Sequence, residues 1–546
     1  MSDSSDSSLE SRYNKKCYKK SKKYHRSRGS NKCSEHKHRG PRGRKGSGDH
    51  ENRKKLCDRK ELSASRNQII CPNIYIINTN TTLEINFPEQ TFYFDASNGP
   101  LSIVLPQACI RGTVIRLILL FKNSDIVTVT TCPLFGTFTL NPKNSQKNLV
   151  FVGCKWKIID NENNNSFYPT NQQVPKLIGP SSIGAALQGH SVALSADGDT
   201  VAIGGPNDNS FVGAIWVFVR CGSNWAAQAK LVGTGVISTN SKQGWSVALS
   251  ADGNTLAAGG IQDNSNIGAT WIFIRTGGSW MQQAKLVGTS NNGTSQQGFS
   301  VSLSANGNTL AVGANNDSSG LGATWIFVRS GSSWSQQAKL LGSGLVGASQ
   351  QGYSVSLSAN GDTLAIGGPF DSSNIGAIWI FTRFNTIWTQ FGSKIVAPDA
   401  TGTAGQGYSV ALSSDGNVLA FGGPFDSANN GASWVYIFNG IAWLENVKLV
   451  GIGNVGLSQQ GNSIAISSDG NTLAVGGTMD NSLIGATWIF VRIGPKWIQQ
   501  GNKLVGIGNV GGSLQGFSVA LSSEANTLAI GGPGDNVDIG ATWIFT

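Results

Sequence analysis

Residues 297–350 read QGFSVSLSANGNTLAVGANNDSSGLGATWIFVRSGSSWSQQAKLLGSGLVGASQ. Variants of this unit occur seven times along the chain. The Gln-Gly pair that opens each copy recurs every 54 or 55 residues, at Gln188, Gln243, Gln297, Gln351, Gln406, Gln460 and Gln515. A period this long and this regular is typical of a solenoid or a propeller.

One repeat contains four short segments with the character of β-strands. In the copy at 297 these are FSVSLS (299–304), TLAVG (309–313), GATWIFVR (322–329) and WSQQAKLLG (334–342). Between the first two, Asn306-Gly307 predicts a tight primed hairpin turn, because these residues tolerate positive φ. Four strands in about 54 residues match the size of a propeller blade.

The third strand of the repeat is apolar on both faces. Trp325 and Phe327 point one way, and Thr324, Ile326 and Val328 point the other. A sheet with one solvated face would alternate apolar and polar residues. We therefore expect each blade to lie between two neighbours, with the serine-rich first strand innermost and the strand with Gln and Lys at the rim.

The two ends of the repeat region predict a closed ring. The seventh copy stops at Thr546, after its third strand. The missing fourth strand has a counterpart before the first copy, in Gln172-Gln173-Val174-Pro175-Lys176-Leu177-Ile178-Gly179. Pairing the two segments would remove both open sheet edges. The sequence thus predicts an all-β fold, a seven-bladed β-propeller closed by an N-terminal strand, over residues 166–546.

The repeat resembles a known family. Gln515-Gly516-Phe517-Ser518-Val519-Ala520, Ile530-Gly531-Gly532-Pro533 and Gly540-Ala541-Thr542-Trp543-Ile544-Phe545 are similar to FG-GAP repeats of the integrin α-subunit propeller type. Kelch repeats are a second, poorer match in spacing. FG-GAP repeats often carry a calcium loop between strands one and two, where this chain has a tight Ser-Ala-Asp-Gly turn. The resemblance therefore implies the fold, whereas calcium and other cofactors are not expected. The long, nearly identical copies behind a basic tail also resemble repeat proteins of giant amoeba-infecting viruses.

Residues 1–66 form a basic N-terminal tail. They hold 21 of the 42 Lys and Arg residues and 8 of the 31 Asp and Glu residues, which gives this segment a net charge of +13. With so few large apolar residues, the tail is predicted to be disordered. It is either an arm that binds nucleic-acid phosphates or another acidic surface, or a solvated tail without a fixed partner. Its cysteines and histidines match no structural-zinc spacing.

Residues 67–165 alternate apolar and polar residues and predict a small antiparallel β domain, joined to the repeats by an Asn-rich linker. The spaced pattern LP…G…I…N…VTV…L…G…W-I-I resembles small β modules of phage tail fibres. Cys71, Cys109, Cys132 and Cys154 would form two disulfides in an oxidising environment or remain buried thiols in the cytosol.

The sequence also gives expectations about location. The first residues lack the apolar segment of a conventional secretory signal, which predicts synthesis in the cytosol. The longest apolar run, near 114–121, contains Arg116 and is too short to span a bilayer, so no membrane insertion is expected.

One carboxylate per blade is the candidate ligand site. Strand parity places the loops between strands two and three on the same face as the blade-to-blade linkers. There the repeats carry Asp208, Asp263, Asp317, Asp371, Asp426, Asp480 and Asp535. The alternative is an Asx-turn, in which each Asp caps its own loop. One carboxylate per blade supplies too few oxygens for calcium, so no metal site is expected.

No catalytic residues are predicted. The repeats contain a single histidine, His190, and no Ser/His/Asp, Cys/His, metal or phosphate-loop arrangement. The sequence favours a non-enzymatic structural or adhesion protein, associated with a virion, whose propeller face binds a protein or glycan. The alternative is an intracellular protein-interaction scaffold with a nucleic-acid-binding tail.

Overall fold

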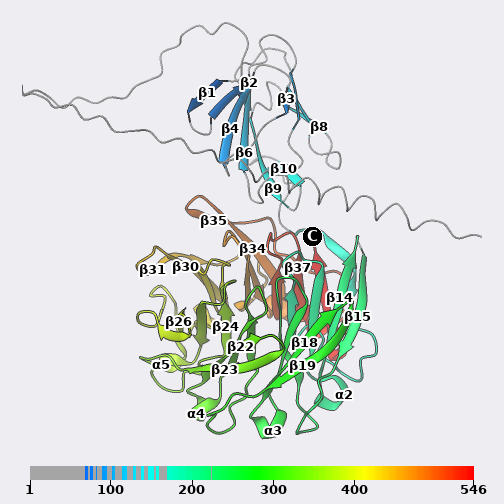
Figure 1. The fold of residues 1–546 in the computed structure, drawn as a ribbon, viewed down its shortest axis with the longest axis vertical. Helices are drawn as coiled ribbons and strands as arrows, with labels where there is room; N and C mark the ends of the chain where they lie inside the picture. The colour runs from blue at the N-terminus through cyan, green and yellow to red at the C-terminus, as the bar shows by residue number, and fades with distance from the viewer. Residues whose placement is uncertain are drawn as a thin grey trace, which may run out of the picture. The chain divides into compact units, whose positions relative to one another are not determined.

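The structure is a computed structural model that describes residues 169–546, except Ser223, and ten strands within residues 68–158 (Figure 1). The predictions for residues 1–66 and for pairing among the N-terminal cysteines lie outside the described residues. Within the described part of the chain, no helix is long and apolar enough to cross a membrane.

The ten N-terminal strands form two sheets. One has the order β1-β2-β4-β6-β9-β10 and the other the order β3-β5-β7-β8. Their bounds are β1 (Gln68–Cys71), β2 (Ile74–Ile77), β3 (Thr81–Thr82), β4 (Glu89–Phe94), β5 (Leu101–Val104), β6 (Val114–Leu119), β7 (Val127–Thr130), β8 (Thr137–Leu140), β9 (Gln146–Val152) and β10 (Lys155–Ile158).

The prediction that residues 67–165 are antiparallel is wrong in part. The pairs β2–β4, β4–β6, β3–β5 and β5–β7 are parallel. From β2 to β7 the chain alternates between the two sheets. Each strand therefore enters its sheet in the same direction as the previous strand of that sheet, and only the later pairs β6–β9, β9–β10 and β7–β8 are antiparallel.

Residues 172–546 form seven four-stranded antiparallel blades, which confirms the predicted propeller. Blades 1 to 4 comprise β12 (Ser191–Leu194), β13 (Thr200–Gly205), β14 (Ala214–Cys221), β15 (Asn224–Leu231); β16 (Gln243–Leu249), β17 (Thr255–Gly260), β18 (Ala269–Thr276), β19 (Ser279–Leu286); β20 (Ser300–Leu303), β21 (Thr309–Ala314), β22 (Ala323–Ser330), β23 (Ser333–Leu340); and β24 (Ser354–Leu357), β25 (Thr363–Gly368), β26 (Ala377–Phe384), β27 (Ile387–Gln390). Blades 5 to 7 comprise β28 (Ser409–Leu412), β29 (Val418–Gly423), β30 (Ala432–Phe438), β31 (Trp443–Leu449); β32 (Gln460–Ile466), β33 (Thr472–Gly477), β34 (Ala486–Ile493), β35 (Lys496–Gln499); and β36 (Ser518–Leu521), β37 (Leu528–Gly532), β38 (Ala541–Phe545), β11 (Gln172–Leu177).

The ring closes as the split seventh copy predicted. β11 is the outer strand of blade 7 and pairs antiparallel with β38, with Gln172 opposite Phe545 and Leu177 opposite Thr542. The apolar cluster at this junction contains Leu177 and Ile544 from blade 7 and Trp216 from blade 1. The first and last segments of the propeller are therefore part of one continuous core.

Hydrogen bonds near the axis join every blade to the next. The serine that begins the regular part of strand one donates its hydroxyl to a glycine carbonyl of the following blade, as in Ser300 to Gly352 at 2.9 Å. The same bond occurs at all seven junctions, and Ser518 to Gly189 completes the circle at 2.8 Å. Strand one is innermost because its small side chains allow this approach.

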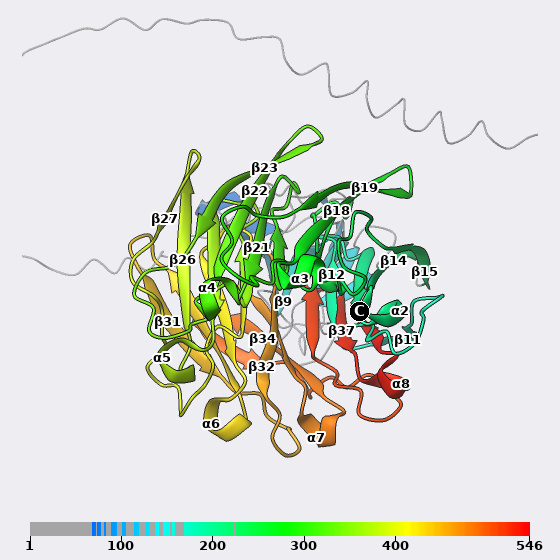
Figure 2. The ribbon, with the colours of Figure 1, turned by 90° about the horizontal axis from the view of Figure 1, so that it is seen from below.

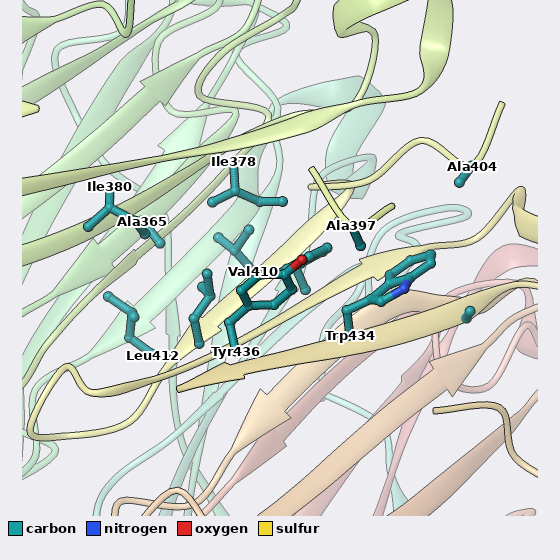
Figure 3. Packing of buried hydrophobic residues seen from close by; sticks show 12 residues of the cluster. Ala365, Ile378, Ile380, Ala397, Ala404, Val410, Leu412, Trp434 and Tyr436 are labelled. Carbon is teal, nitrogen blue, oxygen red and sulfur yellow. The ribbon is translucent and has the colours of Figure 1, made fainter. Parts of the chain in front are cut away.

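Apolar residues pack between blades rather than within one. The cluster in Figure 3 joins Ala365, Ile378 and Ile380 of blade 4 to Trp434 and Tyr436 of blade 5. Strand three is buried on both faces along most of its length, as predicted. Its tryptophan is fully buried in all seven blades, at Trp216, Trp271, Trp325, Trp379, Trp434, Trp488 and Trp543. These tryptophans are blade-packing residues.

The hairpin between strands one and two differs from the predicted primed turn. The Ser304 carbonyl accepts the N–H of Gly307, so Ala305 and Asn306 are the central residues of the turn; neither has positive φ, whereas Gly307 has a φ of 65°. This geometry is a type I turn followed by a left-handed glycine. The Ser304 hydroxyl and the Asn306 side chain bond inside the turn, which favours this form over the primed one.

Candidate binding face

One face of the propeller carries the blade-to-blade linkers and seven short turns, and we call it the linker face. The linkers are residues 178–190, 232–242, 287–299, 341–353, 391–408, 450–459 and 500–517. The turns are α2 (Asp208–Phe211), α3 (Asp263–Asn266), α4 (Asp317–Gly320), α5 (Asp371–Asn374), α6 (Asp426–Asn429), α7 (Asp480–Leu483) and α8 (Asp535–Asp538). Figure 2 shows the turns arranged around the axis. In each turn two inner residues have left-handed φ and ψ, as at Ser318 and Ser319.

The Gln-Gly motif fixes the inner end of each linker. In the first copy, the Gln188 side chain accepts the N–H of Gly179 and donates to its carbonyl, at 2.5 and 3.2 Å. The same two-way bond recurs in the other six blades. The following Gly189 has a φ of 85° and packs against blade 7 backbone, where a Cβ would lie 2.5 Å from the Ala541 oxygen. The motif therefore orients the residue that comes next.

The seven candidate carboxylates are not displayed on the linker face. Asp208, Asp263, Asp317, Asp371, Asp426, Asp480 and Asp535 are each 0–1 % exposed. One carboxylate oxygen accepts a linker N–H at 2.6–2.8 Å, such as that of Asn292 at Asp317. That donor lies 25 or 26 residues earlier in the chain, so the alternative of a local Asx-turn is wrong as well.

The second carboxylate oxygen of each Asp pairs with a lysine that lies in strand four or, at Lys394 and Lys503, a few residues after it. Six of these pairs measure 2.5–2.9 Å: Asp208–Lys230, Asp263–Lys285, Asp317–Lys339, Asp426–Lys448, Asp480–Lys503 and Asp535–Lys176. Asp371 pairs with Lys394 in the same way. In five of these pairs the lysine also lies over the buried tryptophan, as at Lys339, whose Nζ is 4.7 Å from the Trp325 ring centroid. The sequence analysis placed the strand with Gln and Lys at the rim and did not predict this ion pair.

These contacts give the aspartates a structural role. A buried charge is tolerated when it is paired and hydrogen-bonded, and each carboxylate has both a lysine and a linker amide. The ammonium occupies the position that a cation would take. Among the described residues, no cluster of three or more His, Cys, Asp or Glu side chains could hold a metal ion.

The residues that follow Gln-Gly form a belt of rings at the linker face. The belt consists of His190, Trp245, Phe299, Tyr353, Tyr408, Asn462 and Phe517, one residue from each blade. Five neighbouring ring pairs have centroids 4.4–5.7 Å apart, running from Phe517 through His190 to Tyr408. Asn462 interrupts the rings and donates to the Phe517 carbonyl at 3.1 Å. All seven side chains are half-buried.

Polar atoms within the belt are held by their neighbours. His190 Nδ1 lies 2.9 Å from the Trp245 carbonyl and donates its hydrogen to it. Burial and the adjacent Tyr408 hydroxyl raise the pKa of Tyr353 above its usual range. Burial, with a further contribution from the Lys242 charge, lowers the pKa of His190 to about 4. His190 and Tyr353 are therefore uncharged at neutral pH.

The low pKa of His190 predicts a pH-dependent stability. Its pKa is about 4 in the folded protein and 6.5 unperturbed. Protonation therefore favours the unfolded chain, and the stabilisation present above pH 6.5 is lost as the pH falls toward 4. Relative to His190→Phe, we expect the wild type to lose about 2 kcal/mol between pH 7.5 and 4.5 in urea unfolding. Parallel pH profiles for the two proteins would contradict this assignment. Phenylalanine occupies the equivalent position in blades 3 and 7.

A groove of about 290 Å³ opens on the linker face between blades 4 and 5. Its walls include Pro369, Phe370, Phe425 and Ala428, and its polar groups are Asn374, Thr403 and Asn429. Phe370 and Phe425 extend the belt outward, with ring centroids 6.0 and 5.7 Å from Tyr353 and Tyr408. The groove and belt are thus adjacent parts of one aromatic surface.

Exposed aliphatic side chains surround this aromatic surface on the linkers. Ile237 is 68 % exposed and Val346 is 56 % exposed. Further exposed members are Ile183, Ile452, Val455, Leu457, Ile507 and Val510. These side chains add apolar contact area on the linkers, although comparable exposure occurs at the opposite face, as at Phe384 and Ile441.

The sequence prediction selected the aspartates and missed the aromatic belt. The signal was present in the position after Gln-Gly, which holds a ring in six of seven copies while its identity varies among His, Trp, Phe and Tyr. Neither a protein-family model nor a curated protein matches the chain. The candidate face is therefore defined by its own geometry.

Proposed function

We propose that this chain is a non-enzymatic binding protein of the structural or adhesion class, and that the linker face of its propeller binds a protein or glycan. The belt carries this proposal. Its rings are half-buried and lie next to a groove. Aromatic side chains offer large contact areas at low entropic cost and are common at the centres of interfaces.

The contrast between constant and variable positions supports this role. The Asp–Lys pairs, the buried tryptophans and the Gln-Gly motif are the same in all seven blades and hold the ring together. The belt residues and the residues just before each Asp differ between blades. The blades share the residues that hold the ring together and differ in the side chains at the linker face. This arrangement suits recognition of a ligand rather than catalysis by a set of charged residues.

The resemblance to FG-GAP propellers supports adhesion as the class of function. The order of modules is consistent with a surface or virion-associated protein, in which the basic arm anchors to an acidic partner and the propeller presents the face. The alternative is an intracellular interaction scaffold whose tail binds nucleic acid, and the charge of +13 on residues 1–66 favours it. Salt-dependent DNA binding that disappears on deletion of residues 1–66, together with absence of the protein from purified particles, would favour that alternative.

Matched charge substitutions test the binding face. Full-length protein is applied to a printed glycan array and a protein array, and each hit is titrated with two variants. Val346→Lys places a charge on the linker face, whereas Ile441→Lys places one on the hairpin between strands three and four, at the opposite face, where Ile441 is 82 % exposed. We expect Val346→Lys to weaken binding at least tenfold, since a lysine must be desolvated there. Ile441→Lys should bind normally. Equal affinity of the Val346→Lys variant and the wild type would refute the linker face as the site.

A further inference from the structure

Beside the groove between blades 4 and 5, one position of the repeat lacks a side chain. Gly405 precedes the Gln-Gly motif of blade 5 and has a φ of 66°. The six equivalent residues also have positive φ, yet all carry side chains: Leu187, Lys242, Gln296, Gln350, Gln459 and Leu514. A Cβ on Gly405 would lie 2.9 Å from the Phe425 ring and 4.0 Å from the Pro369 Cβ, two of the groove's walls. The glycine thus removes the group that occupies this place in every other blade.

The side chains at the equivalent junctions show what Gly405 leaves open. Gln350 accepts a hydrogen bond from Asn315 at 3.2 Å, and Gln459 accepts one from Thr478 at 3.4 Å. Lys242 lies over the Phe211 and Trp245 rings, 5.4 Å from each centroid. Each of these side chains spans the space beside a strand two to three loop. At the junction of blades 4 and 5, Gly405 has no side chain to span the corresponding space.

The two phenylalanines of the groove are also specific to these blades. Phe370 and Phe425 stand immediately before Asp371 and Asp426. The other five blades have Asn207, Gln262, Asn316, Met479 and Gly534 at this position. Both rings are half-buried and contact the belt tyrosines. Two aromatic walls and the missing side chain therefore occur together at one junction of seven.

The polar groups of the groove are available to a ligand. No hydrogen bond to the side chains of Asn374, Thr403 or Asn429 occurs among the described residues, and all three residues are exposed. No ionisable side chain lines the groove. The nearest aspartates in sequence, Asp371 and Asp426, are buried in their pairs with Lys394 and Lys448. The groove therefore suits a neutral molecule that has both an apolar face and several hydroxyl or amide groups.

We propose that this groove binds one neutral sugar residue of a glycan, with a ring face on Phe370 or Phe425 and hydroxyls on the Asn374, Thr403 and Asn429 side chains. Its volume lies at the lower end of the range for small-molecule pockets, which fits a single substituted ring. In small-molecule sites, apolar walls bury the ligand and a few polar groups set its orientation. This inference rests on the proposed function and names the ligand class of that face.

Saturation-transfer NMR on the full-length protein tests the inference with methyl glycosides of neutral hexoses and N-acetylhexosamines. We expect at least one glycoside to bind in the millimolar range. Two variants then replace groove residues with those of other blades: Gly405→Gln introduces the glutamine of Gln350, and Phe425→Asn the asparagine of Asn316. Each should weaken binding at least tenfold. Leu514→Gln, the same position in blade 7, is the matched control and should leave affinity unchanged.

Binding of none of these glycosides would overturn the inference, and so would binding that Gly405→Gln and Phe425→Asn leave intact. Selective binding of a peptide from a peptide library at a Gly405-dependent site, without sugar binding, would also overturn it. Circular dichroism melting shows whether each variant is folded, and Phe425→Asn adds no side chain that must be accommodated. If none of the sugars binds while Val346→Lys weakens binding of an array ligand at least tenfold, only this inference is refuted and the linker face remains the binding face.

Discussion

Deleting residues 1–178 is expected to prevent stable folding of the propeller, whereas deleting residues 1–168 is not. Both variants lack the whole N-terminal region, and they differ only by the segment that contains β11. Without β11, the outer edge of β38 is unpaired and the ring can no longer close.

Two losses set the size of this effect. Lys176 is removed, which leaves the Asp535 carboxylate, 0 % exposed, without its cation. Breaking a buried ion pair in this way costs about 3–5 kcal/mol. Leu177 is removed from the core shared with blade 1, at a further cost of about 2 kcal/mol. The sum approaches the whole stability of a typical domain. Thermal melting compares the two truncations, and a shared melting temperature would show that β11 does not close the ring.

Lys339→Met is expected to destabilise the protein by about 3 kcal/mol. The substitution leaves Asp317 buried with its linker and Ser318 hydrogen bonds but no cation. Adding Asp317→Asn should recover most of the loss, because a neutral amide can still accept the Asn292 N–H. Chemical unfolding of the single and double variants measures both effects.

The control for this experiment is Lys496→Met, an exposed lysine at the start of β35. It should change stability by less than about 0.5 kcal/mol. A Lys339→Met effect as small as that of the control would mean that the ion pair does not hold turn α4 and its linker in place.

The closed ring could be predicted from sequence because two independent features agreed on it. The repeat length of 54 or 55 residues predicted a four-stranded blade. The last copy holds only strands one to three, and the segment Gln172–Leu177 matches its missing fourth strand, which predicted the closed ring. Sheet direction in residues 67–165 could not be predicted in the same way. An apolar–polar pattern identifies a strand but not the strand with which it pairs. Strands β2 to β7 belong by turns to the two sheets, and no local sequence pattern indicates this.

The aspartates were misjudged because polar residues in glycine-rich loops usually lie at the surface. In six of the seven pairs the lysine partner lies 22 or 23 residues further along, as in Asp317 and Lys339, whereas Asp535 pairs with Lys176 before the first repeat. That constant spacing was visible in the sequence, but only the register of strands two, three and four brings the two residues together. The missing side chain at Gly405 could not be recognised as part of the site from the sequence, because its meaning depends on the Phe425 ring, which a Cβ at this position would approach to 2.9 Å.

Hydrogen exchange of β38, followed by mass spectrometry on the intact chain, tests the closed ring most directly. The Thr546 N–H donates to Asn171 at 2.9 Å, and β11 covers the outer edge of the strand. Amides of residues 541–546 should therefore exchange as slowly as those of β22, the equivalent strand of blade 3. Exchange at the rate of an unstructured peptide of the same sequence would contradict a propeller closed by its own N-terminal strand.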